Sequence, residues 1–160
     1  MVQSISYPSA EFPGPPRITV EIPDAWQTLT VPGVQLAVAQ PRVEGSFRAN
    51  VVVTVQRFGA DFTLEAAQAG LAQRKAALPE LEELGTGEID VEGTTWIASE
   101  YGYTQPGRPT VVQAARYAVF ARGEVATDVV EIVGSCGAES AEEEIELVRS
   151  IQDSVSVSTD

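Results

Sequence analysis

The chain has 160 residues, of which 44% are hydrophobic, and carries 23 Asp and Glu against 10 Lys and Arg, for a formal net charge of −13. A chain of this length is expected to form one domain that buries its own hydrophobic core. Its negative charge argues against nucleic acid and anionic lipid as partners, because both carry negative charge themselves.

The residue inventory lacks the side chains on which most enzymes depend. There is no His, and therefore no Ser-His-Asp or Cys-His arrangement and no imidazole metal ligand. Cys136 is the only Cys, so the chain cannot form an internal disulfide or a structural zinc site made of cysteines. The acidic residues lack the EF-hand spacing, and the glycines form neither a dinucleotide-binding fingerprint nor a P-loop. We expect no catalytic residue, no metal and no cofactor.

The N-terminal residues and the distribution of apolar residues along the chain indicate where the protein is located. No apolar stretch approaches the roughly 20 residues of a membrane helix, and no basic start with an apolar run marks a secretory signal. We therefore expect a cytoplasmic protein without membrane insertion, or an envelope or secreted protein if a signal segment was removed. Residues 1–16 include four prolines and predict a disordered lead-in, so a single α+β domain is expected over residues 17–157.

The first part of the domain predicts strands. Arg17–Ile22 alternates between polar and apolar residues, and Pro23–Trp26 predicts a turn. The indole of Trp26 is expected in the core or as a lid over one end of the sheet, and a ligand contact is the rarer alternative. Val34–Gln40 is a second short strand. Arg48–Phe58 is a strong strand prediction, and its Val-rich middle is apolar on both faces, which is typical of a strand covered on two sides.

A helix is predicted in the middle of the chain. Thr63 is a suitable N-cap for a helix over Leu64–Leu78, in which leucines recur every seven residues around Leu71. Arg74 and Lys75 are expected to face outward from this stripe.

Two further helical segments are predicted. Pro79–Leu84 is expected to form one more helical turn, and Ser140–Glu143 is a capping box that starts a closing helix with Val148 and Ile151 buried. Cys136 precedes that helix, whose N-terminus can lower a thiol pKa. Because it has no His partner and acidic residues follow it, we expect no reactive role.

Three consecutive strands follow the middle helix: Thr94–Thr104, Thr110–Ala121 and Glu124–Val133, joined by short Pro and Gly turns. Glu88–Val91 leads into them through Glu92-Gly93. The order of strands, helix, strands and helix predicts an α+β fold, in which a mainly antiparallel sheet is flanked by helices on both faces.

The pairing of these strands determines which polar residues share a face. We expect a two-residue turn at Arg122-Gly123 and another turn at Pro106–Pro109. This register would place Arg116 between Val129 on one neighbouring strand and Ser99 on the other. One face would then carry Ser99, Tyr101, Tyr103, Arg116 and Glu131. The other face would carry Trp96, Glu100, Gln113, Tyr117 and Asp128.

We interpret the first group as a candidate pocket for a ligand or partner, lined by the two tyrosines and closed by an Arg116–Glu131 pair. The alternative is a structural salt bridge at the border of the sheet. A slip of one residue in the register would exchange the two faces. On the other face, Glu100 and Asp128 resemble the carboxylate pair of a glycosidase, but carboxylates are frequent in so acidic a chain and the pair alone indicates no enzyme.

Two segments resemble a known family. Ile22–Trp26 resembles the opening of the Mog/PsbP-like superfamily, in which a strand is followed by Pro, two residues and Trp. Phe47–Val53 is similar to the aromatic, Asn and apolar run of its actinobacterial branch, the LpqN/LpqT-type proteins. The order of helix, strands and closing helix follows the same pattern over about Arg17–Val157.

The resemblance implies an antiparallel sheet between helices, a Mog/PsbP-like α/β/α sandwich. Members of this superfamily include a Ran-binding protein, an extrinsic photosystem subunit, cell-envelope lipoproteins and chaperone-like secretion adaptors, which are mostly non-enzymatic binders. The chain departs from the lipoproteins because it lacks their N-terminal lipidated Cys, and the family offers no catalytic residue to carry over.

Three functions are therefore considered. The first is a non-enzymatic protein-binding module or chaperone-like adaptor, whose partner and oligomeric state the sequence does not give. The alternative is a small-ligand-binding protein with a tyrosine-lined pocket on the sheet. The third is an enzyme that uses only Glu, Asp, Tyr or Arg, for which convergent carboxylates in a deep cleft would be the sign.

Overall fold

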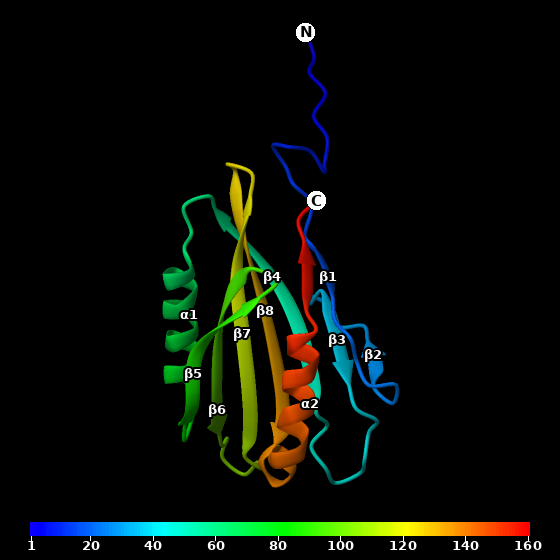
Figure 1. Ribbon diagram of the computed structural model, residues 1–160, viewed down its shortest axis with the longest axis vertical. Helices are drawn as coiled ribbons and strands as arrows, with labels where there is room; N and C mark the ends of the chain where they lie inside the picture. The colour runs from blue at the N-terminus through cyan, green and yellow to red at the C-terminus, as the bar shows by residue number, and fades with distance from the viewer.

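A seven-stranded antiparallel sheet forms the body of the protein, and the computed structural model describes all residues from 1 to 160. The strands are β1 (Arg17–Thr19), β2 (Gln27–Leu29), β3 (Leu36–Ala39), β4 (Asn50–Gly59), β5 (Glu82–Val91), β6 (Thr94–Tyr103), β7 (Val111–Arg122), β8 (Ala126–Gly137) and β9 (Ser156–Ser158). The helices are α1 (Leu64–Ala76) and α2 (Ala141–Asp153), the latter preceded by a 3-10 turn at Ala138–Ser140. The order in the sheet is β2-β3-β4-β8-β7-β6-β5, while β1 pairs with β9 in a separate ribbon (Figure 1).

The two helices cover opposite faces of the sheet. Tyr117 and Ala118 are consecutive in β7 and therefore point to opposite sides. Tyr117 packs in a cluster with Leu71 of α1, whereas Ala118 packs in the larger cluster with Val148 and Ile151 of α2. Figure 1 shows α2 in front of the sheet and α1 at its left margin. The predicted α+β fold, with helices on both faces, is confirmed.

Strand β4 is buried unequally on its two faces. Val51 and Val53, on the α2 side, are fully buried, whereas Val52 and Thr54 on the α1 side are only partly buried. The reason is that α1 lies over β7 rather than over β4. The prediction of a strand covered on both sides therefore holds on one face only, and the other face contributes to a groove.

The first residues of both helices match the prediction, but one cap does not form. The Thr63 hydroxyl accepts a hydrogen bond from the Ala66 N–H at 3.2 Å, as an N-cap does. Ser140 occupies the N-cap position of α2 but makes no side-chain cap bond, because it ends the 3-10 turn and has a ψ of 14° instead of an extended value. The predicted helical turn at Pro79–Leu84 is wrong, since β5 already begins at Glu82.

The predicted register of the central hairpins is also wrong. Arg122 pairs with Ala126, so the β7–β8 loop has three residues and begins with Gly123 at a φ of +59°. The β6–β7 loop is longer than expected as well, because its first strand pair is Tyr103 with Val111. Both errors change the pairing by an odd number of residues. As a result, Arg116 lies beside Ala98 and Ile132 and faces α2.

Helix α2 approaches the sheet closely at one glycine. A Cβ atom built on Gly134 of β8 would lie 2.0 Å from Cγ1 of Val148, which is itself fully buried. A glycine in a strand often marks such a close approach. Ion pairs on both sides reinforce the contact, Arg149 with Glu100 at 2.6 Å and Arg116 with Asp153 at 2.6 Å.

A buried carboxylate at the end of the sheet ties strands to both chain termini. Asp128 of β8 is fully buried and pairs with Arg57 of β4 at 2.7 Å and with Arg122 of β7 at 2.9 Å. Arg57 also donates to the carbonyl oxygen of Pro13, and Arg122 donates to that of Thr159 at 3.2 Å. Burial alone would raise the pKa of Asp128, but the two guanidinium groups outweigh burial and lower it.

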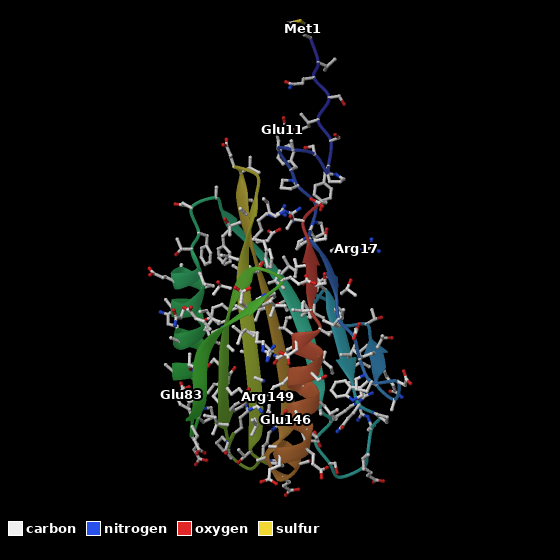
Figure 2. The ribbon with its side chains drawn as sticks, viewed as in Figure 1. Met1, Glu11, Arg17, Glu83, Glu146 and Arg149 are labelled. Atoms are coloured by element: carbon white, nitrogen blue, oxygen red, sulfur yellow. The ribbon has the colours of Figure 1, made fainter.

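The N-terminal residues that precede these contacts extend away from the sheet. Figure 2 shows Glu11 near the end of the fold and Met1 farthest from it. Residues 1–16 contain neither helix nor strand. No helix in the structure combines the length and apolarity required to cross a bilayer.

Replacing Gly134 with Ala should destabilise the fold by about 1–3 kcal/mol, because the added methyl group collides with a stiff, buried β-branched side chain. Chemical denaturation measures this change. A Gly134→Ala, Val148→Ala double variant should recover part of the loss, and Gly87→Ala, where a Cβ has open space, is the matched control. Equal stability of Gly134→Ala and wild type would contradict the packing.

Replacing Asp128 with Asn should cost about 3 kcal/mol, because Arg122 is left buried without its carboxylate. The pKa of Asp128 is lower in the folded chain than the ordinary value of 3.8, so its contribution is complete above that value and is lost as the pH falls below it. Unfolding free energies measured between pH 7 and pH 3 should therefore converge for the two proteins at low pH. The exposed Asp90→Asn serves as control, and a constant difference across this range would refute the assignment.

Candidate binding groove

A groove of about 280 Å³ lies between α1 and the sheet. Its floor is formed by β4, β7 and β8. Thr54 of β4 is paired with Glu131 of β8, and Glu131 is in turn paired with Tyr117 of β7, so these three side chains stand in one row. Gln56 and Val129 form the next row along β4 and β8. The floor therefore combines apolar surface with a few hydrogen-bonding groups.

Small residues on α1 keep the groove open. Ala66, Ala67 and Gly70 form the wall that the helix presents, and none of them has a side chain long enough to reach the floor. At one end, the rings of Phe58 and Phe62 stack with their centroids 3.8 Å apart and form an aromatic wall. The groove is thus a consequence of the small residues on the side of α1 that borders it.

An ion pair lies at the other end of the groove. Arg74 of α1 donates from one NH2 group to Glu131 at 2.5 Å, which is the only hydrogen bond of the Arg74 side chain in the structure. The Arg74 side chain is 58% exposed and that of Glu131 is 17% exposed. Both residues also line a second cavity of about 200 Å³, so the pair stands between two adjoining spaces.

The second cavity contains a polar network under α1. The ammonium of Lys75 donates to Ser99 at 3.0 Å, pairs with Glu83 at 2.6 Å and lies 5.1 Å from the ring centroid of Tyr101. The Tyr101 hydroxyl donates to Oε1 of Gln113 at 3.0 Å. Burial, followed by the charge of Glu131 nearby, raises the pKa of Tyr101 to about 12, so this phenol stays a donor at neutral pH. Figure 2 places Glu83 on β5 near the end of α1.

Four of the five predicted site residues share the α1 face, but only two of them line the two adjoining cavities. Tyr101 and Glu131 line the second cavity, and Glu131 also lines the groove. Ser99 is buried beneath Lys75, and Tyr103 borders a separate hollow of about 210 Å³. Arg116 is on the opposite face and pairs with Asp153, because the register differs from the predicted one. The predicted Arg116–Glu131 pair is therefore wrong.

Several residues of this region lie elsewhere than the sequence pattern predicts. Gln113 and Tyr117 were expected on the opposite face and were misplaced by the same register error. Lys75 was expected to face outward, yet it is buried, and Arg74 reaches the floor. The spacing contained the signal, since Arg74 follows Leu71 by three residues and Lys75 follows it by four, which puts both beside the buried stripe.

The other chemical candidates are not arranged for reaction. The Cys136 thiol is fully buried, and burial raises its pKa to about 11, the opposite of activation by a helix N-terminus. Glu100 pairs with Arg149 of α2, and Asp128 pairs with arginines at the end of the sheet, so the two carboxylates do not act on one site. Figure 2 shows Arg149 beside Glu146 on α2. No group of three or more His, Cys, Asp or Glu is placed to hold a metal ion.

No known protein family and no curated protein sequence matches this chain. Solved structures do. LpqN of Mycobacterium tuberculosis, described as involved in cell envelope biogenesis, matches with a TM-score of 0.72 at 17% identity, over 91% of this chain and 86% of its own. A protein of unknown function from Pseudomonas aeruginosa matches with a TM-score of 0.61 at 14% identity, over 85% and 94% of the two chains.

The cyanobacterial PsbP of Synechocystis matches with a TM-score of 0.58 at 15% identity, over 98% of each chain. None of the three is described as an enzyme. At these identities the likeness establishes the fold and nothing more specific. The resemblance found in the sequence is thus confirmed at the level of architecture, and the chain has the PsbP/LpqN-like fold.

Proposed function

We propose that this chain is a non-enzymatic binding protein that holds a small molecule in the groove between α1 and the sheet. The observation that carries the proposal is the groove itself, with its volume of about 280 Å³ and a lining that combines apolar and hydrogen-bonding side chains. Ligand sites in proteins typically have volumes from about 300 Å³ upward and this kind of lining. The adjoining cavity of about 200 Å³ extends the available space.

The states of the titratable groups support binding over catalysis. General acid–base catalysis requires a group whose pKa lies near the operating pH. Tyr101 has its pKa raised to about 12, and Glu131 and Lys75 are each held in ion pairs. The side chains of this region are thus arranged as fixed donors, acceptors and charges, which suits recognition.

Protein binding, the adaptor function, is the second candidate and has a separate observation in its favour. β5 is a ten-residue edge strand with one neighbour, β6, so half of its backbone groups are free to pair with an extended segment. Its exposed side chains include Glu82, Glu88 and Asp90, which would favour a basic partner. The cytoplasm is our proposed location, and the cell envelope is the alternative that the likeness to LpqN supports.

Filling the groove should abolish small-molecule binding. A Cβ on Gly70 has open space, so a Gly70→Leu side chain is accommodated in the groove and displaces a ligand without disturbing the fold. We expect compounds that raise the thermal unfolding temperature of the wild-type protein to lose this effect with Gly70→Leu. The matched control is Ala69→Leu, one residue earlier on α1 at an exposed position outside the groove. Compounds that stabilise wild type and Gly70→Leu equally would show that the groove is not the site.

A further inference from the structure

We infer that the ligand of the groove is an organic cation, with an ammonium or guanidinium group attached to an apolar body. In the free protein, the guanidinium of Arg74 pairs with Glu131 at the position that the ligand's cationic group would take. This inference rests on the proposed function and specifies the ligand class. It is based on the observation that, of the paired charges Arg74 and Glu131, only one is held in a fixed position in the groove.

The negative charge is fixed and the positive charge is mobile. Glu131 is the one acidic residue and Arg74 the one basic residue among those that line the groove. Glu131 projects from the middle of β8, with both neighbouring strands paired around it, and is 17% exposed. Arg74 projects from α1 on a long flexible side chain and is 58% exposed. Arg74 can therefore rotate into water when another cation takes its place, because the incoming charge keeps Glu131 paired.

This asymmetry discriminates between ligand charges. A cation can replace Arg74 at Glu131 one for one, and the displaced guanidinium becomes hydrated. An anion attracted to Arg74 would have to lie beside Glu131, and like charges brought together in a partly buried site repel each other. The charge of Glu131 reaches across both cavities, since it adds to burial in raising the pKa values of Tyr101 and Tyr117.

The surroundings of the ion pair also suit a cation. Tyr117 is paired with Glu131 in the floor of the groove, and the electron-rich face of an aromatic ring attracts ammonium and guanidinium groups. The formal net charge of −13 steers cations toward the protein and anions away from it. Because Arg74 also borders the second cavity, its departure would join the two spaces and make room for the apolar body.

Two probes with the same apolar body and opposite charge test the inference. Isothermal titration calorimetry would compare 1-naphthylmethylammonium with 1-naphthylacetate on the full chain. We expect the ammonium to bind and the carboxylate to bind more weakly. Arg74→Ala should tighten ammonium binding by up to about fivefold, because the competing guanidinium is gone. Glu131→Gln should weaken it about tenfold or more, because the fixed charge is lost.

Control variants separate charge recognition from damage to the fold. Arg74→Lys keeps a competing cation and should bind the ammonium like wild type. Arg149→Ala removes an arginine from the opposite face of the sheet and should leave both affinities unchanged. Thermal unfolding of each variant shows whether it is folded, and Glu131→Ala replaces Glu131→Gln if the latter is not.

The outcomes that would contradict the inference differ from those that would contradict the proposed function. Preferred binding of the carboxylate, lost in Arg74→Ala, would make the groove an anion site and overturn the inference. Equal binding of both probes, or binding of neither, would overturn it as well. If other compounds still bind in a Gly70-dependent manner, the proposed function survives this failure. If no compound depends on Gly70, the proposed function itself fails.

Discussion

The alternation of side chains along β8 determines what each face of the sheet becomes. Val130 and Ile132 point toward α2 and are fully buried, while Val129 and Glu131, which alternate with them, point toward α1 and line the groove. One strand thus supplies both the larger core and the floor of the candidate site. Because the alternation has a period of two, any change of one residue in the pairing of β8 would put Glu131 into the core.

The two helices use this strand in different ways. α2 packs closely because Gly134 has no side chain, and its margins are held by ion pairs to β6 and β7. α1 has no such contact and presents alanines and Gly70 toward the floor, so space remains beneath it. The tightly packed face stabilises the fold, and the loosely covered face is left available for a ligand.

The sequence predicted the elements well because their signals are local. Alternation, the Thr63 cap and the acidic start of the closing helix each lie within a few residues, and the helices and the strands β4, β6, β7 and β8 appear near the predicted positions. The exception is β5, of which only Glu88–Val91 was predicted. The candidate site was predicted less well because it depends on pairing between strands. A three-residue loop in place of a two-residue turn brought Tyr117 next to Glu131, and together with the longer β6–β7 loop it moved Arg116 to the other face. A single sequence does not encode that loop length in any local pattern.

The groove under α1 is the place where we propose that a ligand binds. Amide chemical shifts of the isotope-labelled protein, titrated with 1-naphthylmethylammonium, test this most directly. We expect the shifts to change at α1 and at the segments of β4, β7 and β8 that line the groove, with β5 and the α2 side unaffected. Changes confined to β5, or no changes at the groove with a bound probe, would contradict it.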